Sequence, residues 1–489
     1  MSRGGLCAAR RTKAIAQHMM STAASASEPS VKFESNRALR TYILNRPTKL
    51  NALDESMLSL LRPKIEEWSS SDLCGTILGT GVGRAFCAGG DIANVVLNAS
   101  DPNLRHQAID FFKREFEMDY ILAALSKPYV VLLDGFTMGG GVGLAAHAPF
   151  RIATENTTFA MPETKIGYCP DVGASYFLSR LDGELGTYFA LTSDIIRGRA
   201  VFEHGFATHF IPARRIPTLI ERLAALEDPH PTAIDQAIEE LVSEREPSEP
   251  PLAMSGLMRE ALDFAFRHNS IEAIFEDLRK FSEHHDSQVR SWAKQTLETL
   301  EFRSPTSLKV ALSAIRQGRS MTLLEALNME LKIATAYCNG ASPDFPTGVN
   351  AVLGGGKEKK DERPNWSPST VDGVTDEIVS RFFEGSSSFL SNVPTLDIPE
   401  VFAKKISLQP MKFGLPTEEE IGTVVRGEHK TGGTMGMTLD ELVGKFGNLR
   451  PGKLGVKEKI LEVASRRCEI VDNADGNFVW LKWKSAPTQ

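Results

Sequence analysis

The 489-residue chain lacks the residue patterns that mark several common classes of protein. Its six cysteines are scattered and include no C-x-x-C pair, which excludes a disulfide framework or a zinc module and fits a reducing compartment. The ten histidines form no cluster with metal-ligand spacing, so we expect no metal. No apolar run approaches the roughly 20 residues that a membrane helix needs, and we expect a soluble protein.

Familiar catalytic signatures are also missing. The chain contains no G-x-S-x-G, no H-E-x-x-H and no G-x-x-x-x-G-K-[ST]. The segment GGGKEKK (354–360) lacks the spacing and the Ser or Thr of a phosphate loop, and it reads as a solvated loop. The formal net charge of -7 argues against a general polyanion binder.

The N-terminal segment 1–27 is rich in Arg, Ser and Ala, and the first acidic residue is Glu28. This composition is typical of a mitochondrial transit peptide, the alternative being a disordered tail without an address. We expect the protein in the mitochondrial matrix and leave this segment out of the fold prediction.

Three further regions follow from the pattern of strands and helices. Residues 28–212 alternate strand-like and helix-like stretches, which predicts an α/β core. Residues 213–385 show mainly helical periods and predict a helical part packed on that core. Residues 390–489 predict a small α+β extension with helices at 439–446 and 456–467.

The extension differs from the rest of the chain in charge. It ends in a predicted hairpin that turns at Asp475-Gly476. From Val443 to the end, nine Lys and Arg stand against five Asp and Glu, a balance of roughly +4 in an acidic protein. A basic face beside Phe478, Trp480 and Trp483 could contact RNA, or the unit could pack on its own core with the aromatic side chains buried.

Two glycine-rich turns could hold a substrate. FCAGGD (86–91) and TMGGGVG (137–143) each follow a buried strand and open toward a helix. Glycine allows close backbone approach, and two N–H groups aimed at one point form an oxyanion hole. The alternative is that both are ordinary tight turns.

The second turn also fits a dinucleotide fingerprint. Gly141, Gly143 and Ala146 match G-x-G-x-x-A, and Glu155 could then bind a ribose. However, Phe136–Gly140 separate the strand from the fingerprint, and Pro149 stops the helix after about two turns. We therefore do not expect NAD binding.

Two carboxylates eight positions apart lie in FAMPETKIGYCPDVG (159–173). Glu163 and Asp171 each follow a proline and stand among apolar residues. Burial raises a carboxyl pKa, which suits a general base or acid near neutral pH. The alternative is a pair of surface turn acids, since Pro-Glu and Pro-Asp are common turn dipeptides.

Taken together, these stretches resemble the crotonase (enoyl-CoA hydratase/isomerase) superfamily from about residue 31 to about 385. The resemblance is carried, in chain order, by NRPTKLNAL, FCAGGDI, KPYVVLLDGFTMGGGVGL, FAMPETKIGYCPDVG and SPTSLK. It implies a spiral of β-β-α units with a helical C-terminal part. It also implies acyl-CoA substrates and no cofactor.

The resemblance assigns roles by motif match. It implies that backbone N–H groups of Ala88 and Gly140 form the oxyanion hole. It implies that Glu163 activates water or attacks the carbonyl, that Asp171 assists, and that Glu115 is a further acid of the substrate pocket. Fungal relatives with such an extension resemble a protein of the small mitochondrial ribosomal subunit, which makes that subunit a possible partner.

Two positions separate branches of the superfamily. Hydratases carry a second Glu just after the glycine turn, where this chain has Gly143, so a thioester hydrolase is expected instead. The hydrolase branch usually continues PDVG with two glycines, where this chain has Ala174 and Ser175. We expect the added side chains to narrow the pocket. The oligomeric state and the acyl specificity do not follow from the sequence.

Overall fold

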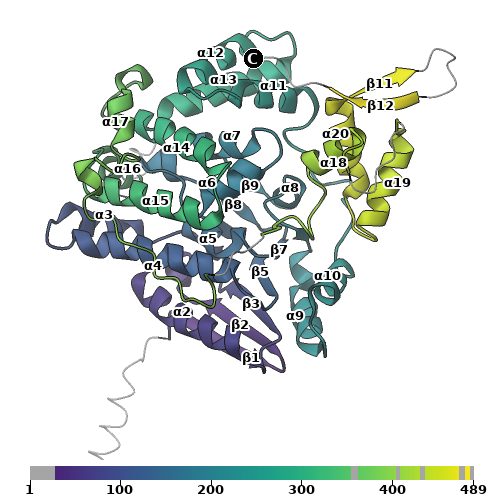
Figure 1. Cartoon of the computed structure of the whole chain (residues 1–489), viewed down its shortest axis with the longest axis horizontal. Coiled ribbons are helices and arrows are strands. Elements are labelled where there is room, and N and C mark those ends of the chain that lie inside the picture. Colours follow the sequence, from purple (N-terminus) through teal and green to yellow (C-terminus); the bar gives the residue numbers. More distant parts are fainter. Residues whose placement is uncertain (1–27, 354–361, 404–407, 430–435, 473–478, 485–489) are drawn as a thin grey trace, which may run out of the picture.

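The computed structural model describes residues 28–353, 362–403, 408–429, 436–472 and 479–484 (Figure 1). The predicted transit segment, the loop 354–360 and the predicted hairpin turn at Asp475-Gly476 lie outside the described residues. Within the described ranges, no helix combines the length and the apolar character needed to cross a bilayer.

Two sheets form the core of the molecule. The larger has the order β1-β2-β3-β5-β7-β10, with β1 antiparallel to β2 and parallel pairing from β2 onward. The smaller has the order β4-β6-β8-β9, with only β9 antiparallel. Their strands are β1 Val31–Asn36, β2 Leu39–Leu44, β3 Thr76–Gly81, β4 Ala85–Cys87, β5 Tyr129–Leu133, β6 Phe136–Met138, β7 Phe150–Ala153, β8 Thr158–Ala160, β9 Ile196–Arg197 and β10 His209–Phe210.

The two sheets are built by one repeated step along the chain. β3, β5 and β7 each join the larger sheet, and the strand that follows each of them joins the smaller sheet. A helical segment then leads to the next pair. This is the predicted β-β-α spiral, and it places the turns after β4, β6 and β8 at one end of the smaller sheet because those strands are parallel.

Both faces of the larger sheet are covered. Every residue of β5 is buried, which explains its unbroken apolar run. On one face, Leu39 and Val130 pack with residues of α9 and α10. On the other face, the hydroxyl groups of Tyr42 and Tyr129 lie 2.6 Å apart. The sheet is therefore a rigid base for the turns that follow its strands.

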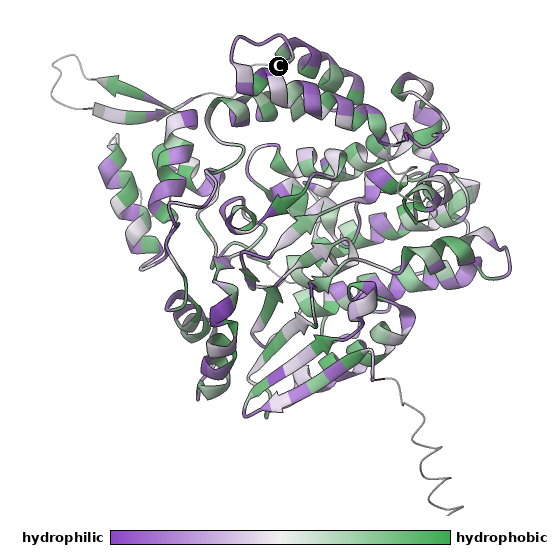
Figure 2. Cartoon of the chain, turned by 180° about the vertical axis from the view of Figure 1, so that it is seen from behind, coloured by the Kyte–Doolittle hydropathy of each residue, from purple (hydrophilic) through white to green (hydrophobic). Residues whose placement is uncertain are grey.

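The helices before the extension are described in two groups. The core contains α2 Glu55–Ser70, α3 Ile92–Ser100, α4 Arg105–Ala123, α5 Gly140–Ala146, α6 Ala174–Phe177, α7 Leu185–Thr192 and α8 Arg199–Glu203. The helical part contains α9 Ile216–Ala225, α10 Pro231–Glu239, α11 Gly256–Phe266, α12 Ile271–Phe281, α13 Ser287–Phe302, α14 Pro305–Gly318, α15 Leu323–Cys338, α16 Asp344–Leu353 and α17 Asp376–Ser380. Figure 2 shows both hydrophobic and hydrophilic residues on α12 and α13 at the top of the view, as expected for helices with one buried and one exposed face.

The extension contains α18 Glu418–Val425, α19 Leu439–Leu449, α20 Val456–Arg467 and the hairpin strands β11 Cys468–Asp472 and β12 Val479–Trp483. The two predicted helices and the hairpin are confirmed, and α18 was not predicted. The hairpin projects from the body at the right of Figure 1.

The extension is anchored on the rest of the chain. The ring of Phe413 stacks on Phe150 of β7 with centroids 4.6 Å apart, and the Arg151 guanidinium donates to the Pro410 carbonyl at 3.0 Å. Two of its lysines pair with acids that precede the extension. Lys459 lies 2.6 Å from Asp182 and Lys453 lies 2.5 Å from Glu239. The basic balance of the extension thus complements acids of the preceding domain, an arrangement that the sequence did not suggest.

Candidate active site

The motif NRPTKLNAL positions the first glycine turn. The Asn51 amide donates to the carbonyls of Val82 and Ala85, and its oxygen accepts from the N–H of Arg46. Because Asn51 is fully buried, these three bonds fix the loop around the turn that follows β4.

Ala88 and Gly90 differ in what their N–H groups do. The N–H of Ala88 donates to the carbonyl of Leu50 at 3.0 Å, so it does not face a substrate as expected. The nitrogen of Gly90 instead lies 3.4 Å from the position that a Cβ would take at Gly140. Among the described residues, no backbone acceptor is recorded for the Gly90 N–H. We correct the expected donor from Ala88 to Gly90.

The second glycine turn joins β6 to α5. Gly139 has φ 47°, a conformation that glycine adopts readily, and Gly140 begins the helix. The N–H of Gly140 has no acceptor in its own helix because it belongs to the first turn. Gly90 and Gly140 thus bring two unengaged N–H groups together, as the oxyanion-hole interpretation requires.

Helix α4 brings two carboxylates against this turn. Glu115 is 2% exposed, and a Cβ at Gly140 would lie 2.0 Å from its Oε1. Asp119, one helical turn later, is fully buried, and a Cβ at Gly143 would lie 2.6 Å from its Oδ2. Glycine is therefore required at both positions, because any side chain would displace a carboxylate.

Glu163 approaches the turn from the other side. It begins a 3-10 helix, Glu163–Ile166, directly after β8 and Pro162, and it is 5% exposed. Its Oε1 lies 3.1 Å from the position of a Cβ at Gly139. Its Oε2 has no hydrogen-bond partner within the described part of the chain. The structure thus brings Glu163, Glu115 and Gly140 together.

Asp171 lies in a tight turn held from several directions. The Tyr168 hydroxyl donates to its Oδ2 at 3.0 Å, and the carboxyl is 6% exposed. The next residue, Val172, has φ 58°. This is an unfavourable conformation for a β-branched residue, and such strain persists only where neighbouring contacts enforce it.

Glu330 of α15 supplies much of that enforcement. Its carboxylate accepts from the N–H of Gly173 at 2.6 Å, and from the N–H and Oγ of Ser175 at 2.9 and 2.5 Å. Ser175 and Ala174 are fully buried, and α6 packs against α14 and α15. The Ser175 side chain thus points at Glu330. It does not narrow the pocket as expected, and its hydrogen bond fixes the turn instead.

The electrostatics of these five carboxylates are unusual. No Lys or Arg within the described ranges pairs with Glu115, Asp119, Glu163, Asp171 or Glu330. Burial raises the pKa of Glu163 to about 8, helped by the charge of Glu330. Burial also raises the pKa of Glu115 to about 8, together with the nearby charge of Glu163.

The remaining acids are shifted in the same direction. Burial, and then the charges of Glu115 and Glu163, raise the pKa of Asp171 well above its usual value. Burial and Glu115 do the same for Asp119. Burial raises the pKa of Glu330 to about 7, although its three donors oppose the shift. The group can therefore exchange protons near neutral pH.

Asp119 and Glu330 were missed from the sequence. Asp119 follows Glu115 by four positions, so both must lie on one face of a helix, and this spacing could have identified it. Glu330 stands in the apolar stretch NMELKIATAYC, where a lone acid is a signal of burial. No local pattern shows that it contacts a turn 155 residues away.

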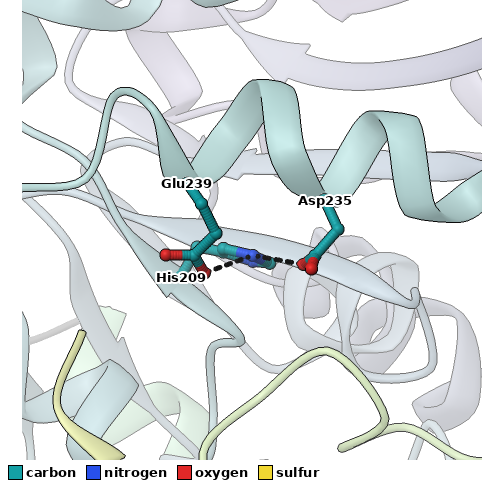
Figure 3. Close-up of side chains that lie close together, drawn as sticks. All are labelled: His209, Asp235 and Glu239. Atoms are coloured by element: carbon teal, nitrogen blue, oxygen red, sulfur yellow. Dashed lines mark hydrogen bonds and ion pairs between the residues drawn. The ribbon is translucent and has the colours of Figure 1, made fainter. Parts of the chain in front are cut away.

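A second cluster could in principle hold a metal ion. His209 of β10 lies between Asp235 and Glu239 of α10, with its Nε2 at 3.0 and 3.2 Å from their oxygens (Figure 3). The ammonium of Lys453 already lies 2.5 Å from Glu239 Oε1. The ammonium group of Lys453 thus supplies the cation of this cluster. The cluster attaches the extension to α10.

Comparison with known proteins gives consistent results. Residues 39–383 match the family model described as enoyl-CoA hydratase/isomerase. A protein of Neurospora crassa named small ribosomal subunit protein mS47 is 37% identical over 89% of this chain and 85% of its own length. The mitochondrial 3-hydroxyisobutyryl-CoA hydrolases of Danio rerio and Homo sapiens are 39% and 37% identical, over 76% and 78% of this chain and 93% and 95% of their own.

Solved structures agree with these relatives. A carnitinyl-CoA dehydratase from Mycobacterium thermoresistibile superposes with a TM-score of 0.64 at 30% identity, covering 73% of this chain and 96% of its own. An enoyl-CoA hydratase from Rhodobacter sphaeroides superposes with a TM-score of 0.61 at 29% identity, covering 73% and 97%.

Proposed function

The chain belongs to the enoyl-CoA hydratase/isomerase family, and from that premise we propose that it hydrolyses 3-hydroxyisobutyryl-CoA to 3-hydroxyisobutyrate and CoA in valine breakdown. The observation that carries the proposal is the pair Glu163 and Asp171 beside a glycine turn whose Gly143 position has no room for a side chain. The acid that a hydratase would carry at that position cannot be accommodated without displacing Asp119.

The proposed reaction begins with the thioester carbonyl between the N–H groups of Gly90 and Gly140. Both donors are fixed by the backbone, so they stabilise the negative charge that develops on the oxygen without reorganising, a contribution of about 2.7–4 kcal/mol for each donor. The acyl group then lies beside Glu115 and Glu163.

Ionised Glu163 either takes a proton from a water molecule or attacks the carbonyl carbon itself. In the first case, hydroxide adds to the carbonyl, and the tetrahedral adduct collapses by breaking the C–S bond. In the second, an anhydride forms and water cleaves it. In both cases the CoA thiolate leaves and gains a proton, for which Asp171, whose pKa is raised by burial, is the proposed donor.

The CoA part of the substrate needs a path to the carboxylates of this site. A cavity of about 500 Å³ between α2, α3 and α4 is lined by Asp91 and Phe111. Phe111 lies 3.2 Å from the position of a Cβ at Gly90, so the cavity ends next to the proposed oxyanion hole. We propose that the pantetheine arm of CoA enters there.

The experiment is release of CoA thiol from a short panel of acyl-CoA esters, including 3-hydroxyisobutyryl-CoA and 3-hydroxypropionyl-CoA. We expect the branched substrate to be preferred by the 1–3 kcal/mol that one methyl group contributes in a pocket. Glu163→Gln should remove turnover, and Glu283→Gln, on the exposed surface, serves as the control. Equal release by the wild type and Glu163→Gln would exclude the assignment of Glu163.

A second candidate function is membership of the small mitochondrial ribosomal subunit, with or without hydrolase activity. It is supported by the similarity to the Neurospora ribosomal protein, which covers more of this chain than the hydrolases do. Lys453 and Lys459 face inward, whereas Lys412, Lys457 and Lys482 are among the exposed basic residues of the extension. If the full chain remains in the soluble fraction of a mitochondrial lysate at low salt, this candidate is excluded. Both candidates place the protein in mitochondria.

A further inference from the structure

A second cavity, of about 530 Å³, lies away from the five-carboxylate centre and shares no residue with it. It is bounded by β9, α8, the segment around Pro212 and the loop 243–254. Its floor is apolar and includes the buried side chains of Phe189, Ile196 and Phe210. A ligand with an apolar body would therefore replace water on this floor.

One wall of the cavity carries two buried polar atoms without partners. His204 is 5% exposed, and its Nε2 has no hydrogen-bond partner in the described part of the molecule. Glu203 is in the same situation at its Oε2, while its Oε1 pairs with Arg245. Buried polar atoms are normally satisfied, so this wall is suited to a ligand that supplies the missing contacts.

Both atoms are acceptors. Burial lowers the pKa of His204 to about 3, so the ring is neutral, and the ring interacts with the backbone of Ala253. Because Nε2 is without a partner, we assign the ring proton to the other nitrogen. The Nε2 atom then presents a lone pair. Glu203 Oε2 is also an acceptor without a partner. The wall therefore selects a hydrogen-bond donor, such as a hydroxyl or ammonium group.

The rim of the cavity offers hydrogen-bond donors instead of acceptors. The side chains of Arg197 and Arg214 are exposed and make no ion pair or hydrogen bond within the described ranges. The acids nearby are mostly engaged, since Glu249 pairs with Arg199 and Glu155 accepts from the N–H of Ala213. The two guanidinium groups are thus available to a carboxylate.

We propose that this cavity binds a small carboxylic acid that also carries a hydroxyl or ammonium group on an apolar body. The carboxylate pairs with Arg197 and Arg214, the donor group contacts His204 and Glu203, and the body covers the aromatic floor. Hydroxy acids and amino acids share this chemistry, and the hydroxy acid released by the proposed hydrolysis is one member of the class.

The test is isothermal titration calorimetry on the full chain carrying Glu163→Gln, so that turnover has no part in the signal. The probes share a phenylethyl unit: 3-phenyllactate supplies a hydroxyl, phenylalanine an ammonium group, 3-phenylpropanoate neither donor, and 2-phenylethanol no carboxylate. A second series with 3-hydroxyisobutyrate, isobutyrate and isobutanol tests a smaller body. We expect one of the donor-bearing acids to bind at least about tenfold more tightly than the matched compounds that lack a donor or the carboxylate.

Two sets of variants locate the binding. Arg197→Gln with Arg214→Gln changes only exposed side chains, so the fold should be retained, and we expect about tenfold weaker binding of the acid. His204→Phe should remove the preference for the donor-bearing probes. Arg84→Gln, an exposed arginine outside the cavity, is the control and should bind as before.

Three results would overturn the proposal. They are no heat from any probe at millimolar concentration, equal affinity for acids with and without the donor, and affinity that is unchanged in the Arg197 and Arg214 variant. The last result would place the ligand elsewhere on the chain. None of these outcomes bears on thioester hydrolysis, which is measured separately with the wild type.

Discussion

At the scale of single residues, Glu163 combines a position beside Gly139 with a pKa of about 8. Its role as base or nucleophile requires the ionised form, so kcat/KM should rise about tenfold per pH unit below pH 8 and level off above it. Glu163→Gln should lower kcat by at least about 10²-fold at every pH. A pH profile of thiol release between pH 5.5 and 9 checks this. A rate that is flat between pH 6 and 8 would contradict the role.

Glu330 gives a prediction with a different signature. Its charge contributes to the raised pKa of Glu163, and its oxygens fix the turn after Asp171. Glu330→Gln should therefore shift the midpoint of the pH profile to lower pH and lower kcat by about tenfold or more, with a smaller change in KM. Ser175→Gly keeps the charge and removes one bond, so its midpoint should stay close to that of the wild type. Equal midpoints in all three proteins would show that Glu330 acts only on folding.

Glu115 links the site to stability. Its pKa is about 8 in the folded chain against 4.5 in the unfolded chain, so the folded state holds an extra proton between these values. Stability from this group is complete below about pH 4.5 and is lost as the pH rises toward 8, by at most about 1.4 kcal/mol per unit. Glu115→Gln should flatten the dependence, so its free energy of unfolding relative to the wild type increases from pH 6 to pH 8. Urea titrations at both values measure this, and a difference that shrinks with pH would contradict it.

At the scale of elements, the turn between β6 and α5 is specified by close packing. Gly140→Ala would place a methyl group 2.0 Å from Glu115 Oε1, so the carboxylate must move. We expect a folded protein that is less stable by about 1–3 kcal/mol and has lost at least about 10²-fold in kcat. Circular dichroism and thiol release measure the two effects. Gly444→Ala, with no atom within 4 Å of its added Cβ, is the matched control.

The elements also show what the sequence could and could not predict. The helices expected at 439–446 and 456–467 are observed as α19 and α20 within a few residues, because helical periods are local signals. The family resemblance carried by FCAGGD, TMGGGVG and FAMPETKIGYCPDVG implied a shared site for Glu163, Asp171 and Glu115. The choice between Ala88 and Gly90 depends on which N–H the loop at Leu50 accepts, and the partner of Ser175 lies on a helix 155 residues later. Such contacts between distant segments have no local sequence pattern.

At the scale of the whole molecule, the extension depends on buried ion pairs. Lys459 and Asp182 are 9% and 10% exposed and lie 2.6 Å apart. Removing one partner should destabilise the chain by about 3–5 kcal/mol because the other charge stays buried, whereas Asp182→Asn with Lys459→Met should recover most of that loss. The exposed pair Glu276–Lys280 is the control, with a coupling below about 0.5 kcal/mol. Denaturant unfolding of the wild type, the two single variants and the double variant measures the coupling energy of the pair. Strictly additive changes in the free energy of unfolding would contradict the pairing.

The contact between Asp182 and the extension also has an evolutionary consequence. Asp182 accepts from Lys459 and from the N–H of Glu418, both contributed by the extension. An ancestor without this tail would have left that carboxylate without its partners, and a descendant that loses the tail would inherit the same defect. The aspartate and the tail should therefore be gained and lost together. Across hydrolases of this family, an acid at the position of Asp182 should occur mainly in lineages whose genes also encode the C-terminal hundred residues.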